Sequence, residues 1–239
     1  MIDLRLGRWE DVLADVGEVD AVITDPPYSE RTHSGHDDGG RDGAHRRPIA
    51  YERWDACDMR ALVKHWAARA AGWIVVLSDS EQCSLYRRSL EGAGLCGFQP
   101  VPCVMPGMTV RLAGDGPSSW SIYANVGRPR TKAMATWGTL PGAYIVPPER
   151  AMTVAGGKPL WLMRAIIRDY TRPGDLVCDP CAGGGTTLLA AAIEGRRAIG
   201  AEMDPDTHAK ATARLAAGYT PNMLERLPEV TGEQGGLGL

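Results

Sequence analysis

The sequence predicts an α/β protein built on one doubly wound, mostly parallel β-sheet. Short apolar runs recur along the 239 residues, and segments with helical periodicity separate them. This alternation is typical of parallel sheets, in which a helix carries the chain from one strand to the next. Hydrophobic residues make up 44% of the chain and charged residues 23%, which are ordinary globular values. We therefore expect one main domain with a full hydrophobic core.

The elements follow from the runs in chain order. Strands are expected at residues 3–6, 21–24, 73–78, 97–104, 120–126, 176–178 and 198–201, which makes seven. Helices are expected at residues 58–71, 81–92, 159–170, 186–194 and 205–217. Three stretches interrupt the pattern and predict a polar loop, an irregular insert and a flexible tail at residues 29–48, 129–157 and 221–239.

The charge of the chain limits how it can bind nucleic acid. The formal net charge is -3, so any contact with DNA must use a local basic patch. Two candidates occur, "RDGAHRR" at residues 41–47 and "GRPRTK" at residues 127–132. The apolar stretches are shorter than a bilayer span and the N-terminus is charged, so we expect a cytoplasmic protein that does not enter membranes.

The cysteines and histidines predict no metal site. The six cysteines have no regular spacing, and a cytoplasmic chain keeps them reduced. Cys178 and Cys181 form a single CxxC, but zinc sites usually need a second ligand pair at a set distance. His33 and His36 precede two aspartates in a glycine-rich segment that would hold ligands poorly.

The stretch "VDAVITDPPYSERTH" places a carboxylate, two prolines and an aromatic ring at the end of a predicted strand. Asp25 ends the apolar run, and Pro26, Pro27 and Tyr28 follow it. Prolines fix φ and donate no hydrogen bond, so the carbonyls next to them stay aimed in one direction. On its own this stretch also fits a rigid turn with a packed tyrosine.

A second candidate site lies in "RPGDLVCDPCAGGGTTLLAAAIEGRRAIGAEMDP". A strand ends at Asp179, a glycine-rich turn follows, and a helix opens at Thr186. The next strand ends at Glu202, 23 positions after Asp179, where doubly wound folds hold the hydroxyls of a ribose. The turn is not GxGxxG, and Asp179 would repel a pyrophosphate. The site therefore favours a ligand with a cationic end, such as S-adenosylmethionine, over a dinucleotide, although a structural glycine turn is the simpler alternative.

With both stretches in view, the chain resembles the amino-group DNA methyltransferases, which methylate the exocyclic nitrogen of adenine or cytosine. The motifs "DPPY" and "DPCAGGGTT" carry the resemblance, and "GGKPLWLMRAIIRDYTRPGD" and "IGAEMDP" support it. The catalytic motif precedes the cofactor motif, as in the beta-type members. The resemblance implies an S-adenosylmethionine-dependent methyltransferase fold, a doubly wound seven-stranded sheet with one antiparallel strand at residues 120–126. It further implies one domain at residues 1–220, with a catalytic half at 1–128, a target-recognition insert at 129–157 and a cofactor half at 158–220.

The resemblance also implies site residues. Asp25 and Pro26 would accept the two amino hydrogens of a flipped base, Pro27 would stiffen the motif, and Tyr28 would stack on the base. Arg8 stands where the family often has an acidic residue that holds the adenine, so we expect Trp9 or Met203 to pack on the adenine of S-adenosyl-L-methionine. Cys181 stands where the family often has Phe, which should alter the packing around the methionine part of the cofactor. The cofactor-binding residues implied are Asp179, Pro180, Cys181, Ala182, Gly183, Gly184, Gly185, Thr186, Glu202, Met203, Trp9 and Lys158, the last near the cofactor carboxylate.

DNA is the partner that the resemblance implies, and the two basic segments supply the expected phosphate contacts. These contacts are Arg31, His33, Arg46 and Arg47 around the first segment and Arg128, Arg130 and Lys132 in the second. The insert is short for a target-recognition region. Formation of a homodimer, or the loop at residues 29–48, would then contribute to recognition of the target. Asp25 at the first motif position favours adenine N6 as the target. The alternatives are cytosine N4, then RNA or protein glutamine, then a catalytically silent DNA-binding relative; a dinucleotide-binding dehydrogenase would leave "DPPY" unexplained.

Overall fold

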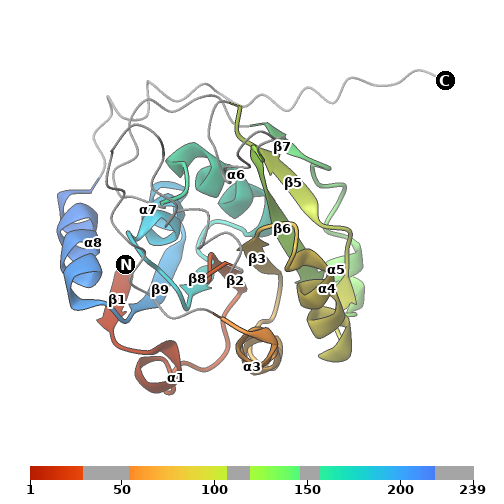
Figure 1. Cartoon of the computed structure of the whole chain (residues 1–239), viewed down its shortest axis with the longest axis horizontal. Coiled ribbons are helices and arrows are strands. Elements are labelled where there is room, and N and C mark those ends of the chain that lie inside the picture. The colour runs from red at the N-terminus through yellow and green to blue at the C-terminus, as the bar shows by residue number, and fades with distance from the viewer. Residues whose placement is uncertain (29–53, 107–118, 146–156, 219–239) are drawn as a thin grey trace, which may run out of the picture.

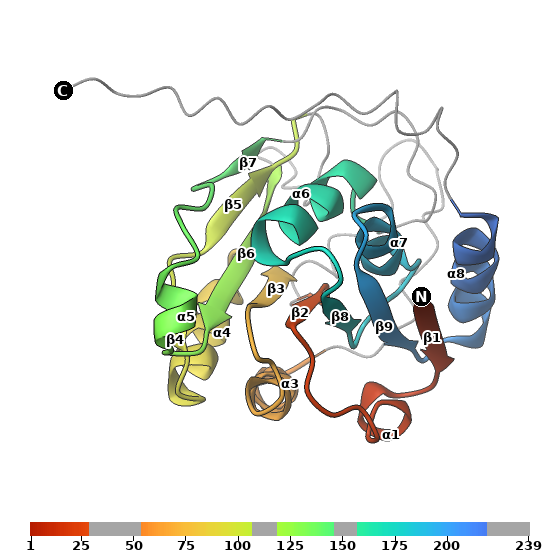
Figure 2. The ribbon, with the colours of Figure 1, turned by 180° about the vertical axis from the view of Figure 1, so that it is seen from behind.

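The structure is a computed structural model, and it describes residues 1–28, 54–106, 119–145 and 157–218. One sheet crosses the molecule and helices cover both of its faces (Figures 1 and 2). The predicted loop at 29–48 and tail at 221–239 lie outside the described residues.

The sheet has nine strands in the order β1-β9-β8-β2-β3-β6-β5-β7, and β4 also pairs with β6. Every antiparallel pairing involves β6, and the remaining neighbours are parallel. The predicted α/β class and the antiparallel strand near residues 120–126 are therefore confirmed. The strands are β1 (Ile2–Leu6), β2 (Ala21–Thr24), β3 (Ile74–Ser78), β4 (Cys96–Gly97), β5 (Val101–Val104), β6 (Ser121–Arg128), β7 (Tyr144–Ile145), β8 (Leu176–Asp179) and β9 (Arg197–Glu202).

The prediction of seven strands was wrong, because one predicted strand is split and one was missed. Gly97 pairs with Gly127 and Val101 pairs with Ala124, so three residues on one side of the gap face two on β6. This extra residue is a β-bulge, and Pro100 within it has no N–H to donate to the ladder. β7 has only two residues, too few to produce a visible period in the sequence.

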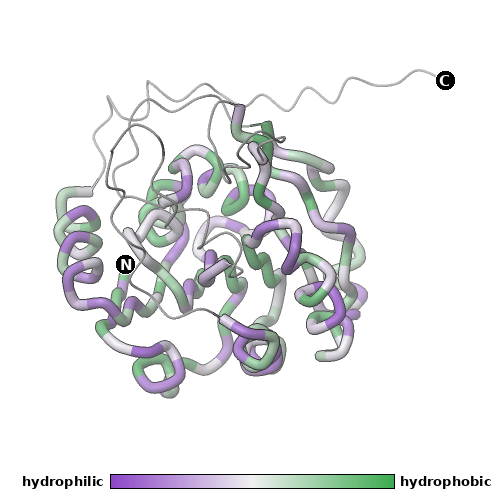
Figure 3. The backbone as a smooth tube through the Cα atoms, viewed as in Figure 1, coloured by the Kyte–Doolittle hydropathy of each residue, from purple (hydrophilic) through white to green (hydrophobic). Residues whose placement is uncertain are grey.

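Alternate residues of the strands feed two hydrophobic clusters on opposite faces of the sheet. In β3, Val75 and Leu77 belong to the cluster with α6 and α7, whereas Ile74 and Val76 belong to the cluster with α1, α3 and α4. Burial on both faces explains why the central strands are continuously apolar. Helices α3 and α8 instead mix hydrophilic and hydrophobic residues (Figure 3). The helices are α1 (Trp9–Val12), α3 (Ala56–Ala67), α4 (Cys83–Gly92), α5 (Lys132–Ala135), α6 (Leu160–Tyr170), α7 (Thr186–Ile193) and α8 (Pro205–Ala217).

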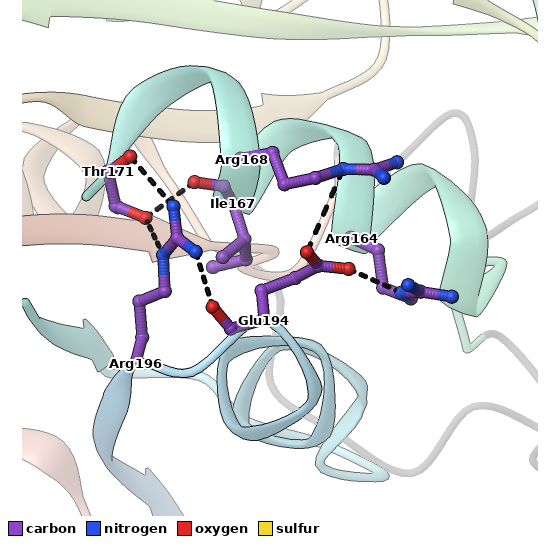
Figure 4. Close-up of polar contacts among 6 residues, drawn as sticks. All are labelled: Arg164, Ile167, Arg168, Thr171, Glu194 and Arg196. Carbon is purple, nitrogen blue, oxygen red and sulfur yellow. Dashed lines mark hydrogen bonds and ion pairs between the residues drawn. The ribbon is translucent and has the colours of Figure 1, made fainter. Parts of the chain in front are cut away.

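A buried polar network joins the ends of α6 and α7 (Figure 4). Thr171 and Glu194 directly follow these two helices, and Arg196 binds both residues. The Arg196 guanidinium donates to the Thr171 hydroxyl at 2.8 Å, to the Thr171 carbonyl at 2.9 Å and to the Glu194 carbonyl. The Glu194 carboxylate accepts from Arg164 Nε at 2.6 Å. The network satisfies helix-end carbonyls that would otherwise lack partners, and it ties the end of α6 to the end of α7.

Candidate active site

The two sequence motifs meet because parallel strands end at the same edge of a sheet. Asp25 directly follows β2, Asp179 ends β8 and Glu202 ends β9. β2 pairs with β8, and β8 pairs with β9, so the three carboxylates follow neighbouring strands. Ligands of open α/β sheets bind at this carboxyl edge.

Lys158 forms an ion pair with Asp25. The Lys158 Nζ donates to Asp25 Oδ2 at 2.5 Å, and the two side chains are 12% and 22% exposed. The other carboxylate oxygen, Asp25 Oδ1, is buried and has no hydrogen-bond partner among the described residues. The carboxylate is therefore anchored through one oxygen and keeps a free acceptor on the other.

Tyr28 lies against the same ammonium group. The Lys158 Nζ is 4.7 Å from the centre of the Tyr28 ring, within the range of a cation–π contact. Burial, followed by the charge of Asp25, raises the pKa of the Tyr28 hydroxyl well above its usual value. The Asp25 side chain adds to this rise through its interaction with the hydroxyl, and the raised pKa keeps the hydroxyl neutral at this site.

Polar residues at and after the end of β3 lie next to the "DPPY" motif. The Gln82 side-chain amide approaches the Pro27 carbonyl at 3.5 Å. The Asp79 carboxylate accepts from the backbone N–H groups of Glu81 and Gln82 at 3.0 and 3.2 Å, which fixes this turn. Asn125 donates to the Ser78 hydroxyl at 2.8 Å. We did not predict these residues, although a polar "SDSEQ" directly after an apolar strand could have indicated them.

A hydrogen bond links the two motifs directly. The Thr24 hydroxyl donates to Asp179 Oδ1 at 2.7 Å, and the backbone N–H of Cys181 donates to the same oxygen at 3.1 Å. Asp179 is only 1% exposed, and its burial, with the nearby charge of Asp25, raises the pKa of the carboxyl to about 6. Hydrogen bonds from Thr187, Thr24 and Cys181 oppose this shift.

The glycine turn is open at Gly183 and is held in place by hydrogen bonds from its neighbours. Gly183 has a φ of 50°, and a Cβ built on it would meet nothing within 4 Å. The backbone N–H groups of Asp204, Gly183 and Met203 bind the Glu202 carboxylate, while burial raises its pKa. Met203 is 47% exposed. From α8, Arg214 reaches back to the Gly184 carbonyl at 2.9 Å and holds the turn in place.

Two residues implied as cofactor contacts make other contacts in the structure. Trp9 is only 7% exposed and packs against His65 and Trp66, with ring centres 5.0 and 6.3 Å away. It presents too little surface to stack on an adenine, so that expectation is corrected. Lys158 was expected near the cofactor carboxylate, and the structure pairs it with Asp25 instead.

The second basic segment lies at the wrong edge of the sheet. β6 begins beside the site, where Tyr123 pairs with Ser78, and runs away from it to Arg128. Five residues of strand cover about 17 Å. Arg128 sits over the rings of Trp73 and Phe98, and Arg130 donates to the Leu95 carbonyl. Arg128, Arg130 and Lys132, which follows them, therefore lie away from the carboxyl edge of the sheet, and the phosphate contacts expected of them stay a prediction. The other expected contacts, Arg31, His33, Arg46 and Arg47, lie outside the described residues.

The described residues contain neither a candidate metal site nor a candidate membrane span. Within the described ranges, no group of three or more His, Cys, Asp or Glu side chains could hold a metal ion. Over the same residues, none of the helices has the length and apolar content needed to cross a membrane.

Residues 145–213 match the model of a family described as DNA methylase (N6_N4_Mtase). The matched range contains the "DPCAGGGTT" motif but not the "DPPY" motif. Over 60 residues the chain is 42% identical to YubD of Escherichia coli (strain K12). Over 50 residues it is 46% identical to the Type II methyltransferase M.MthZI of Methanothermobacter thermautotrophicus. These alignments cover 25% and 21% of this chain, and only 26% and 14% of the lengths of the relatives.

Solved structures match over most of the chain. The M1.HpyAVI–SAM complex has a TM-score of 0.67 at 21% identity and covers 90% of this chain and 100% of that one. TTHA0409 of Thermus thermophilus, complexed with S-adenosyl-L-methionine, has a TM-score of 0.61 at 21% identity, covering 91% and 94%. The cytosine-N4-specific PvuII DNA methyltransferase has a TM-score of 0.63 at 17% identity, covering 88% and 85%. The predicted S-adenosylmethionine-dependent methyltransferase fold is confirmed.

Proposed function

We propose that this chain, which resembles the amino-group DNA methyltransferases in its family match and its fold, is a DNA methyltransferase that uses S-adenosyl-L-methionine. One observation carries the proposal. The free oxygen of Asp25 lies at the same sheet edge as the glycine turn, and the Thr24–Asp179 hydrogen bond joins the two motifs. An acceptor for amino hydrogens thus lies at the same sheet edge as a glycine-rich turn whose backbone a ligand could approach.

The residues at the turn fit the cofactor. Glu202 ends the strand after the turn, where a carboxylate can accept from the two ribose hydroxyls. The open space over Gly183 allows close approach to the backbone, and the exposed Met203 offers an apolar surface for the adenine. Asp179 supplies negative charge for the cationic methionine end. When bound, the cofactor supplies an activated methyl group on its sulfonium. Two solved structures of similar fold are complexes with this cofactor.

Asp25 and Pro26 position the target. The lone pair of an exocyclic amino nitrogen is delocalised into the ring, which makes the nitrogen a poor nucleophile. Asp25 Oδ1 and the Pro26 carbonyl would each accept one amino hydrogen and aim the lone pair at the methyl group. The amino group would gain the methyl group from the sulfonium of the bound cofactor, and Asp25 Oδ1 or solvent would take up the amino proton that is released.

Tyr28 would hold the base outside the duplex. Flipping a base costs a few kcal/mol, and stacking on an aromatic ring returns about 1–3 kcal/mol per base. The prolines of the motif set the direction of the ring, and its packing against the hydrophobic cluster makes it a firm platform.

Adenine N6 is the preferred target, because Asp25 occupies the first motif position and many cytosine-N4 enzymes have Ser there. Cytosine N4 is the second candidate, since the PvuII enzyme shares the fold at a TM-score of 0.63.

The experiment incubates the protein with labelled S-adenosyl-L-methionine and unmethylated duplex DNA, digests the DNA and separates the nucleosides. Label in N6-methyladenine is expected, label in N4-methylcytosine supports the second candidate, and no label in DNA refutes both. Asp25→Ala should abolish transfer while retaining thermal stabilisation by S-adenosylhomocysteine. Stabilisation by NAD instead would refute the cofactor assignment.

A further inference from the structure

The position of the Lys158 ammonium is not explained by cofactor binding. Lys158 lies two residues before α6, and its Nζ reaches both Asp25 and Tyr28. Its side chain is 12% exposed, so the ammonium is largely withdrawn from water. Burying a charged group is unfavourable unless it is paired, and here the pair is with the acceptor of the proposed reaction.

The ion pair divides the two oxygens of Asp25 between two tasks. Oδ2 receives the ammonium at 2.5 Å, and Oδ1 is buried without a partner among the described residues. Leaving a buried carboxylate oxygen without a hydrogen bond is unfavourable, so such an atom indicates a place for a donor. A carboxylate held by one oxygen cannot rotate freely about its last bond, and this fixes where the other oxygen points.

Resting on the proposed function, we infer that Lys158 is a positioning residue for methyl transfer. By holding Oδ2 it turns Oδ1 toward the amino group of the target base. The cation over Tyr28 occupies a ring face on which a base would stack, so the ammonium shifts off the ring when the base enters and keeps its bond to Oδ2. Lys158 therefore acts on the base through Asp25 and does not contact the cofactor.

Two variants test this inference. Lys158→Met keeps a chain of similar length and removes the donor, and Lys158→Arg restores a cationic donor. Lys158→Met should lower kcat on duplex DNA by about tenfold to about 100-fold, the loss typical of a misplaced reacting group. The affinity for S-adenosylhomocysteine should stay within about threefold, and Lys158→Arg should recover part of kcat. Lys64→Met, at an exposed position of α3, is the matched control and should leave kcat unchanged.

A second measurement separates orientation from folding. In the Asp25→Asn background the further loss caused by Lys158→Met should shrink to about threefold or less, because residues that act as one unit are not additive. Unchanged kcat with a lower KM for DNA would show that Lys158 only blocks the base, and weakened S-adenosylhomocysteine binding would return it to the cofactor site. Either result refutes the inference while wild-type transfer to DNA stands. A wild-type protein that transfers no methyl group would instead refute the proposed function, and the inference with it.

Discussion

Acidification should weaken cofactor binding about tenfold between about pH 7.5 and about pH 5, because Asp179 gains a proton. Burial raises the pKa of this carboxyl to about 6 in the free protein. A ligand with an ammonium group favours the ionised carboxylate, so binding lowers the pKa and releases a proton. Affinity therefore rises with pH until it levels off above the pKa of the free protein. At about pH 5 roughly ten carboxyls are protonated for each ionised one, which corresponds to about 1.4 kcal/mol of binding free energy.

Isothermal titration calorimetry with S-adenosylhomocysteine measures both quantities. Titrations in buffers with different ionisation enthalpies should show uptake by the buffer of about half a proton per site near about pH 6. Asp179→Asn should bind more weakly and lose the pH dependence. Glu202, whose pKa burial also raises, is a second carboxylate at this turn, and Glu202→Gln should reduce affinity while keeping most of the pH ratio. A tenfold pH ratio that persists in Asp179→Asn would refute the reasoning.

Two further predictions test the scaffold. Arg196→Met should lower the free energy of unfolding by about 2–3 kcal/mol in urea titrations, since it leaves the Thr171 hydroxyl and two helix-end carbonyls without their donor (Figure 4); an unchanged midpoint would show that water replaces the guanidinium. Arg128→Ala should change the KM for DNA by less than about twofold while costing about 1 kcal/mol of stability from its contacts with Trp73 and Phe98, and a large rise in KM would return this residue to the DNA interface.

The parts of the fold predicted from the sequence are those with a strong period or a clear signal. β2 and β3 are buried on both faces, so each appears in the sequence as a short, continuous apolar run. Runs of this length fit a buried strand and are too short for a typical helix. The bounds of α8 were also correct; it begins at Pro205, with Asp204 as its N-cap. α1 and α5 have four residues each, about one helical turn, and leave no period to detect.

Some residues of the candidate site could likewise be predicted from the sequence, and others could not. Asp25, Asp179 and Glu202 could be found from motifs because each lies at the end of a strand, and parallel strands bring their ends together. The partner of Asp25 could not, because Lys158 is 133 residues away and only the tertiary fold brings the two together. Arg128 was misplaced for a related reason. A run of basic residues does not indicate at which edge of the sheet it lies. Because β6 is antiparallel to β3, the end of β6 that carries Arg128 lies at the edge opposite the site.

The arrangement also explains why the order of the two motifs, "DPPY" before "DPCAGGGTT", does not constrain the geometry of the site. Each functional group sits at the carboxyl end of its own strand or at the start of a helix, and neighbouring strands, not neighbouring residues, set the distances between them. Thr24 at the end of β2 and Cys181 just after β8 both reach the same oxygen of Asp179. Changing the order in which the strands are connected would leave these contacts intact, whereas shifting the register of β2 by one residue would turn Thr24 away and break them. The geometry of the site therefore depends on strand register, and motif order along the chain is free to vary.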